Sequence, residues 1–185
     1  MAEEDFDNNP FELNPFKHNY ELIGQDKNKE EILYRILSGG MLLVEGKPGS
    51  GKTALLKYAV DNLRGKGKVI YIDGKKVSKR LNIEKLLKRG LFKKTPKGMI
   101  LLLDNVQNLT KRNCERVKYY YDQDYIKSVV FSTEDYSHVN FSHSIRDRIG
   151  KRIIRIKDMA KNDAIKMMRS RIGDNNVLTN DYIKE

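Results

Sequence analysis

The sequence has little cysteine and no long apolar run. Cys114 is the only cysteine, which excludes an internal disulfide framework and suits a reducing compartment. The longest apolar run, Met99 to Leu103, is far too short to cross a bilayer. The acidic N-terminal stretch "MAEEDFDNNP" lacks the apolar core of a signal peptide. These absences predict a cytoplasmic protein that does not use a membrane.

Length and composition set the size of the fold. The chain has 185 residues, enough for one sizeable core or for a core and a fragment of a second unit. Hydrophobic residues make up 39% of it, an ordinary share that predicts a globular fold.

The net charge of +11 is unevenly distributed. Residues 64–97 contain 13 Lys or Arg against two acids, a balance of +11, whereas residues 1–31 contain three Lys against nine acids, a balance of −6. A basic cluster of this kind favours a polyanionic partner. The alternative is a solvated helix face that contacts nothing.

Short strands alternate with helices along the chain. Strands are predicted at 41–46, 68–74, 98–104, 128–133 and 152–157, and helices at 26–38, 55–63, 82–90, from 110 onward, at 162–172 and from 178. In the first helix, Ile32, Leu33, Ile36 and Leu37 form one apolar face, and Asn162 is the expected N-cap of the helix at 162–172. Such alternation predicts an α/β fold with a parallel sheet.

A glycine-rich loop follows the first predicted strand. It fits G-x-x-x-x-G-K-[ST] with Gly46, Lys47, Pro48, Gly49, Ser50, Gly51, Lys52 and Thr53, and with Ala54 it forms the predicted nucleotide-binding set. Glycines let successive N–H groups point into one concave space, and the following helix adds its positive dipole end. We expect Lys52 to reach the β- and γ-phosphates of ATP and Thr53 to bind Mg²⁺.

Asp104 stands at the end of the third predicted strand, in "LLLDNVQNL". Because the carboxyl ends of parallel strands share one edge of the sheet, this carboxylate and the phosphate loop are expected to converge. We therefore predict Asp104 to be the second magnesium-binding residue. The alternative is a helix N-cap for the segment that follows.

These motifs resemble those of the AAA+ ATPases. "LIGQDKNKEEI" is similar to the segment before the phosphate loop, "VEGKPGSGKT" and "LLLDNVQNL" to the two Walker motifs, "VVFST" to the sensor-1 strand, "SIRDRIGKRIIRI" to the arginine-bearing helix, and "NDAIKMMRSRIG" to the first lid helix. Within that superfamily the pattern is closest to origin-recognition initiators and transposition ATPases. The resemblance implies a three-layer P-loop NTPase with sheet order 5-1-4-3-2, and ATP bound between protomers.

The same resemblance assigns roles to further residues. It implies that Ser132 or Thr133 acts as sensor 1 and that Arg148, or else Arg146, is the arginine finger that completes a neighbour's site. The alternative for both arginines is an ordinary surface salt bridge. It also divides the chain into an acidic strap at 1–19 with two Asn-Pro-Phe triplets, a nucleotide-binding core at 20–157 and a partial helical lid at 158–185.

Asn105 departs from the family pattern, which often has Glu after the Walker aspartate. An amide cannot accept a proton as a general base, although it can orient water. Glu134, just beyond the fourth strand, is a candidate to compensate, and the alternative is an exposed loop residue. ATP binding with Mg²⁺ is thus expected, whereas fast hydrolysis is in doubt.

The basic stretch between the second and third strands falls where initiators carry DNA-contacting elements. The nucleic-acid candidates are Lys75, Lys76, Lys79, Arg80, Lys88, Arg89, Lys93 and Lys94. Three functions remain open at this point. The first is a slow ATPase acting on DNA or a DNA-bound complex, the second a hydrolysis-impaired regulator that assembles with a protein partner or with itself, and the third a small-molecule kinase, which the lysine-rich stretch disfavours.

Overall fold

The computed structural model describes residues 16, 21–65, 67–77, 81–83 and 97–172. Five strands and five α-helices lie in these ranges, together with two short 3₁₀ turns. In chain order they are α1 (Asp26–Ser38), β1 (Gly40–Glu45), α2 (Lys52–Asn62), β2 (Val69–Asp73), η1 (Gly74–Lys76), β3 (Met99–Asp104), η2 (Val106–Asn108), α4 (Lys111–Asp122), β4 (Ile126–Thr133), α5 (His143–Ile149), β5 (Ile153–Arg155) and α6 (Lys161–Ile172).

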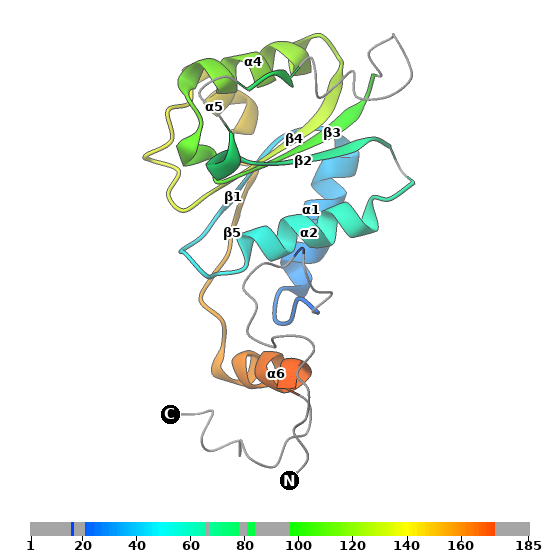
Figure 1. Cartoon of the computed structure of the whole chain (residues 1–185), viewed down its shortest axis with the longest axis vertical. Coiled ribbons are helices and arrows are strands. Elements are labelled where there is room, and N and C mark those ends of the chain that lie inside the picture. Colours follow the sequence, from blue (N-terminus) through cyan, green and yellow to red (C-terminus); the bar gives the residue numbers. More distant parts are fainter. Residues whose placement is uncertain (1–15, 17–20, 66, 78–80, 84–96, 173–185) are drawn as a thin grey trace.

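The strands form one parallel sheet in the order β2-β3-β4-β1-β5 (Figure 1). This confirms the predicted α/β class and the order 5-1-4-3-2. β1 lies between β4 and β5, so the phosphate loop that follows β1 leaves the sheet beside the end of β4.

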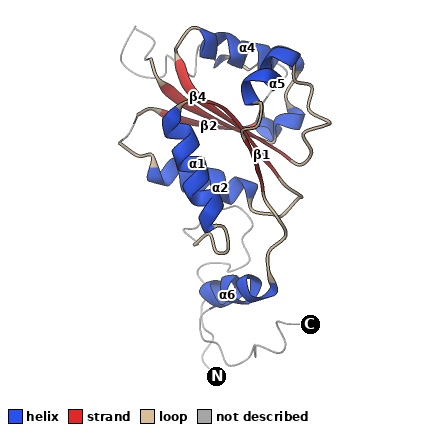
Figure 2. Ribbon diagram, turned by 180° about the vertical axis from the view of Figure 1, so that it is seen from behind, coloured by secondary structure: helices blue, strands red, loops and turns tan. Residues whose placement is uncertain are grey.

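Helices cover both faces of the sheet, which makes three layers. α1 and α2 pack on one face, and α4 and α5 on the other (Figures 1 and 2). All six residues of β3 are buried, and they alternate between the two cores. Ile100 and Leu102 face α1 and α2, whereas Leu101 and Leu103 face α4 and α5. A central strand buried on both sides explains the continuous apolar run in the sequence.

α6 lies apart from the sheet, beyond an extended segment that follows β5 (Figure 1). It begins at Lys161, so the prediction that Asn162 caps it was wrong: Asn162 lies within the first turn. Ile165 and Met168, on the predicted inner face, are partly buried. The end of the predicted lid, residues 173–185, lies outside the described residues, as does most of the predicted helix at 82–90.

Three other details differ from the predictions. β4 begins at Ile126, two residues early, and β5 is limited to three residues. In α1, Ile32 and Ile36 are buried as expected, but Leu37 is 41% exposed because it lies at the margin of the packed face. Thr110 is the N-cap of α4, accepting a hydrogen bond from the Asn113 N–H at 3.2 Å.

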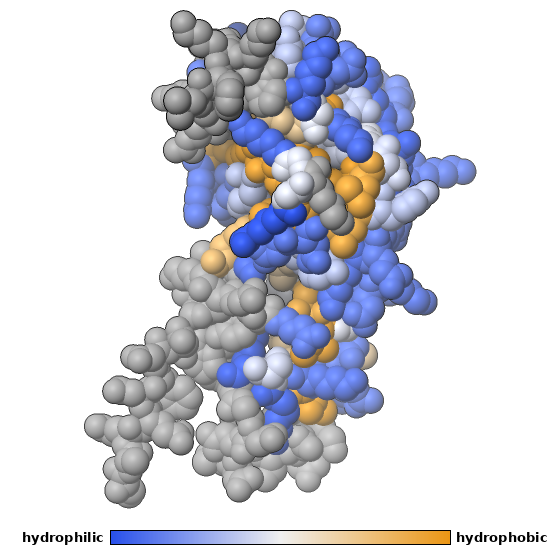
Figure 3. All heavy atoms as spheres, turned by 90° about the vertical axis from the view of Figure 1, so that its right-hand side faces the viewer, coloured by the Kyte–Doolittle hydropathy of each residue, from blue (hydrophilic) through white to orange (hydrophobic). Residues whose placement is uncertain are grey.

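The surface is mostly polar. In the side view of Figure 3, hydrophilic residues surround smaller hydrophobic areas. Among the described residues, none of the helices has the length and apolarity that a membrane crossing requires.

Gly74 lets the end of β2 approach the turn after β3. It is buried, and a Cβ atom at this position would lie 2.5 Å from the Asn105 carbonyl oxygen and 3.0 Å from that of Asp104. Both contacts are with backbone atoms, which cannot rotate away as a side chain would. A glycine here therefore sets the spacing between two strand ends that carry carboxylates.

We expect Gly74→Ala to lower the free energy of unfolding by about 1–3 kcal/mol, because the methyl group overpacks a backbone contact. Urea denaturation would measure the change. Lys76→Ala, an exposed position in the same turn, is the control and should change stability little. Equal unfolding free energies for Gly74→Ala and the parent would contradict the close approach.

Candidate nucleotide-binding site

Three polar side chains line up at the carboxyl ends of β2, β3 and β4. Asp73 is paired with Asp104 in the sheet register, and the pair Leu103 and Phe131, one step earlier, brings Asp104 beside Ser132. Side chains alternate along each strand, so all three point to the side of α1 and α2. α2 begins on that side at Lys52, directly after the phosphate loop.

Asp104 accepts four hydrogen bonds and is only 1% exposed. Its Oδ2 atom accepts from the Thr53 hydroxyl at 2.7 Å and from the Tyr71 hydroxyl at 2.9 Å. Its Oδ1 atom accepts from the Asn105 N–H at 3.0 Å and from the Ser132 hydroxyl. Four donors saturate a carboxylate, and such bonding offsets the cost of burying its charge.

The Thr53–Asp104 bond leaves Thr53 able to bind a cation. The hydroxyl proton points at Asp104, so the lone pairs of Oγ1 are available on its other side. This fits Mg²⁺, which is usually held by one or two protein oxygens and by substrate phosphates. Within the described ranges, no group of three or more His, Cys, Asp or Glu residues forms a metal cage. The donor set therefore fits a metal that arrives with a nucleotide.

Left-handed glycines shape the phosphate loop. Gly49 and Gly51 have φ of 77° and 95°, and Gly51 is the N-cap of α2. The Gln25 side chain donates to the Ser50 carbonyl at 3.1 Å, and this holds the loop from the α1 side. Such a loop presents backbone N–H groups to an anion at the positive end of a helix.

Lys52 is folded back onto the phosphate loop. Its ammonium group donates to the carbonyl oxygens of Gly46 and Lys47 at 2.7 and 2.8 Å, and the residue is 7% exposed. Burial lowers the pKa of Lys52, and this is opposed by the negative charges of Glu134 and Asp104. A cation held only by neutral carbonyls is well placed to exchange them for phosphate oxygens.

The structure also gives Asn105 a partner that the sequence did not reveal. Asn105 adopts a left-handed conformation with φ of 53°, which asparagine tolerates better than most residues. Its Nδ2 atom donates to Asp73 Oδ1 at 2.9 Å, and the same oxygen accepts from the Lys75 N–H at 3.0 Å. The carboxylate only accepts, so this bond fixes the amide orientation, with Nδ2 toward β2.

Of the two sensor candidates, Ser132 is the one that touches Asp104. Thr133 is also buried, but its hydroxyl donates to Gln107 Oε1 at 3.2 Å and to the Asp135 carbonyl at 3.3 Å. Adjacent residues of a strand point to opposite faces, so only one of the pair can reach the carboxylate.

Both arginine-finger candidates are held within their own chain. Arg148 forms an ion pair with Asp122 at 2.8 Å and donates to the Ser144 carbonyl at 2.9 Å. Arg146 donates to the Val139 carbonyl at 2.9 Å and lies over the Tyr136 ring, 4.8 Å from its centroid. Asp122 lies shortly before β4, at the amino end of the sheet and opposite the phosphate loop. Arg148 is therefore not part of its own chain's site.

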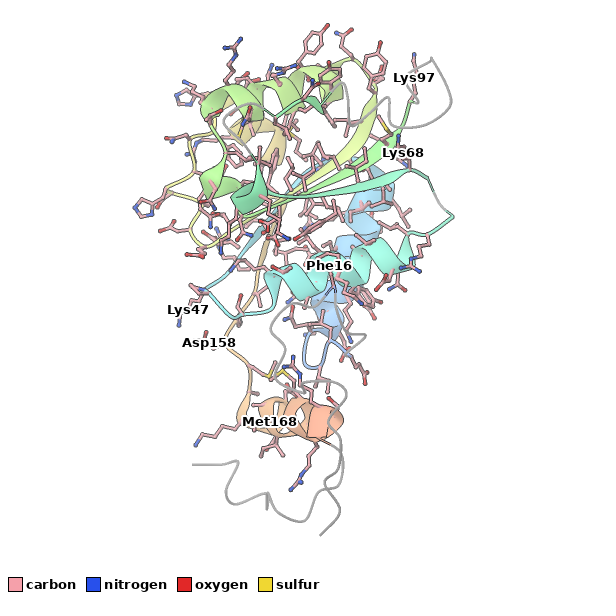
Figure 4. The ribbon with its side chains drawn as sticks, in the orientation of Figure 1. Phe16, Lys47, Lys68, Lys97, Asp158 and Met168 are labelled. Atoms are coloured by element: carbon pink, nitrogen blue, oxygen red, sulfur yellow. The ribbon has the colours of Figure 1, made fainter. Side chains whose placement is uncertain are left out.

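The described lysines of the basic segment lie at both ends of the sheet. Lys75 and Lys76 follow β2, at the edge of the sheet that carries Asp104. Lys68 and Lys97 precede β2 and β3, and Figure 4 shows them together at the other end of the sheet. The other predicted nucleic-acid contacts, Lys79, Arg80, Lys88, Arg89, Lys93 and Lys94, lie outside the described residues.

Comparison with known proteins identifies the family. The profile of a family described as "AAA domain" matches residues 38–157, a span that contains the phosphate loop, Asp104 and Ser132. The chain belongs to this family. No curated protein shows significant sequence similarity to the whole chain.

Solved structures of AAA proteins share the fold. Cdc6p from Pyrobaculum aerophilum matches 89% of this chain with 54% of its own length, at 19% identity and a TM-score of 0.65. AMPPCP-bound DnaA from Aquifex aeolicus matches 89% of this chain with 58% of its own length, at 18% identity and a TM-score of 0.61. Orc1 from Aeropyrum pernix, solved with DNA, matches 82% with 50%, at 16% identity and 0.63. This AAA chain thus spans about half the length of these proteins, and the likeness concerns the fold.

Proposed function

We propose that the chain binds ATP with Mg²⁺ at the edge formed by the phosphate loop, β3 and β4. The Thr53–Asp104 hydrogen bond of 2.7 Å is the observation that carries this proposal, because it joins the loop to the strand-end carboxylate that the family uses for magnesium. The backbone from Gly46 to Ala54 would hold the phosphates, and Lys52 would leave its two carbonyl partners for them.

Each polar group then has a distinct task. Thr53 would bind the metal through its lone pairs, with Asp104 fixing its proton. An Mg²⁺ ion held there would supply positive charge that offsets the negative charge of the phosphates. Ser132 directs its proton to Asp104 and accepts from the Asn105 N–H at 3.3 Å, which leaves one lone pair to accept a hydrogen bond from water. AMPPCP in the DnaA structure supports a nucleotide in a fold of this type.

Replacing Lys52 with Ala should weaken ATP binding by about tenfold to a hundredfold, because a charge-assisted hydrogen bond contributes roughly 1.5–3 kcal/mol. Titration with a fluorescent ATP analogue would measure the loss, and circular dichroism would confirm that the fold persists. Lys111→Ala, an exposed charge at the start of α4, is the control. Parent-like affinity in the Lys52 variant would refute the proposed site.

Hydrolysis is proposed to be slow because position 105 offers no carboxylate. Glu134 raises the pKa of Lys52 through its charge, so its carboxylate is near the ammonium group that would meet the phosphates. It is the candidate within this chain to orient the attacking water. Asn105 is directed toward Asp73 instead, and a glutamate at 105 would face that carboxylate from a left-handed backbone.

The carboxylate of Asp73 determines the effect that Asn105→Glu should have on ATP turnover. Alone, it should not speed ATP turnover, because two carboxylates would repel each other beside Asp104. In Asp73→Ala/Asn105→Glu, both the repulsion and the partner that draws residue 105 toward β2 are removed, so turnover should rise severalfold above the parent. A coupled assay for phosphate release measures both variants, with Glu134→Gln alongside. A fast Asn105→Glu single variant would show that Asp73 does not oppose a carboxylate at 105.

We further propose that the ATPase acts on DNA or on a DNA-bound complex. Support comes from the +11 balance of residues 64–97 and from the likeness in fold to an Orc1 protein solved with DNA. The described lysines divide between the two ends of the sheet, so the proposed contact would use the part of the segment between β2 and β3.

Neutralising part of this segment should weaken binding to all DNA sequences alike and flatten the dependence of log affinity on log salt, by about 0.9 per lost phosphate contact. The variant replaces four residues: Lys88, Arg89, Lys93 and Lys94. A control of equal charge replaces four exposed residues elsewhere: Lys111, Arg112, Lys127 and Lys151. Titrations at two salt concentrations decide the matter, and equal slopes in the two variants would leave the segment as an ordinary charged surface.

The second candidate function is a nucleotide-dependent regulator that hydrolyses little and assembles with itself or a protein partner. The Asn105–Asp73 bond favours it, because it holds the residue next to Asp104 in a non-catalytic contact. In such an assembly Arg148 of one protomer would leave Asp122 to reach the neighbour's nucleotide. Turnover measured with and without duplex DNA, and sedimentation with and without ATP, separate the two functions. A cytoplasmic location stays a prediction.

A further inference from the structure

One of the four donors on Asp104 comes from outside the start of α2, the turn after β3 and the end of β4. Tyr71 belongs to β2, an edge strand of the sheet. Its hydroxyl donates to Asp104 Oδ2, on the neighbouring strand β3, at 2.9 Å. Its ring is partly buried against the core on the side of α1 and α2. The hydroxyl is therefore delivered by a ring that packing holds in place.

Tyr71 and Thr53 share the same carboxylate oxygen. Thr53 can direct its lone pairs toward a cation only while its proton points at Asp104 Oδ2. The position of Oδ2 therefore determines the orientation of the Thr53 hydroxyl. Ser132 and Asn105 donate to the other oxygen, Oδ1. Tyr71 is therefore the second donor, beside Thr53, that holds Oδ2 in place. Partners of this kind, one shell away from a metal, commonly tune metal affinity by about tenfold or more.

We propose that Tyr71 is a positioning residue that holds Asp104 in the orientation Thr53 needs to bind Mg²⁺. The inference rests on the proposed nucleotide site and extends it to the outer strand of the sheet. Tyr71 touches neither nucleotide nor metal in this account. It acts through Asp104.

Tyr71 also contacts Phe16, a residue that precedes α1 in the sequence. Phe16, from the second Asn-Pro-Phe triplet, packs on the Tyr71 ring with a centroid distance of 4.5 Å and an interplanar angle of 50°. In Figure 4, Phe16 is labelled beside α2, on the side of the sheet where Tyr71 packs. Phe16 thus braces the ring whose hydroxyl holds Asp104.

The test measures the affinity of a fluorescent ATP analogue against Mg²⁺ concentration in the full chain. Tyr71→Phe removes the hydroxyl and keeps the ring, and Phe16→Ala removes the ring that packs on Tyr71. Tyr34→Phe, which changes an exposed tyrosine of α1, is the control. Thr53→Ala tests the underlying metal site, and measurements in EDTA report binding without metal. Bound Mn²⁺, detected by electron paramagnetic resonance, gives an independent readout.

In EDTA, Tyr71→Phe should bind the analogue like the parent. Its half-saturating Mg²⁺ concentration should rise by about tenfold, with a smaller rise in Phe16→Ala and none in Tyr34→Phe. Equal losses with and without Mg²⁺ would mark Tyr71 as merely structural and overturn the inference. If Thr53→Ala loses the Mg²⁺ dependence while Tyr71→Phe keeps it, the inference fails and the proposed function stands. A parent that does not bind the analogue would overturn both.

Discussion

The site depends on keeping one buried carboxylate charged. Asp104 is almost inaccessible to water, and an isolated charge in that position would be costly. Four hydrogen bonds compensate, and they come from four different segments: the start of α2, the middle of β2, the end of β4 and the turn after β3. The sheet order, the start of α2 and the left-handed turn at Asn105 are thus linked, because each delivers a donor to the same two oxygens.

Much of this arrangement was predictable because its signals are local. The phosphate loop is a contiguous motif, and Asp104 ends the one strand whose apolar run is continuous. Strand alternation also separates Ser132 from Thr133, although the sequence does not say which of them shares a face with Asp104. The sheet order came only from the family resemblance, since spacing along the chain does not determine which strands are neighbours.

The residues that sequence reasoning missed depend on contacts between strands. Tyr71 reads as an ordinary strand former, and its hydroxyl becomes important only because the parallel register places β2 against β3. The Asn105–Asp73 bond likewise joins positions 32 residues apart. The basic segment looked like one cluster along the chain, but Lys68 precedes β2 and Lys75 follows it, so these two lysines lie at opposite ends of the sheet.

The link between the phosphate loop and α6 has a mechanical consequence. Lys47 of the loop pairs with Asp158 of the extended segment at 2.7 Å, and Figure 4 shows the two side chains meeting outside the sheet. Both are about three-quarters exposed, so water and salt screen the attraction to little more than thermal energy. An ion pair this weak favours one position of the segment before α6 but does not fix it. An anion bound in the loop would compete with Asp158 for Lys47. Loss of the Lys47–Asp158 ion pair would then free the segment that leads to α6.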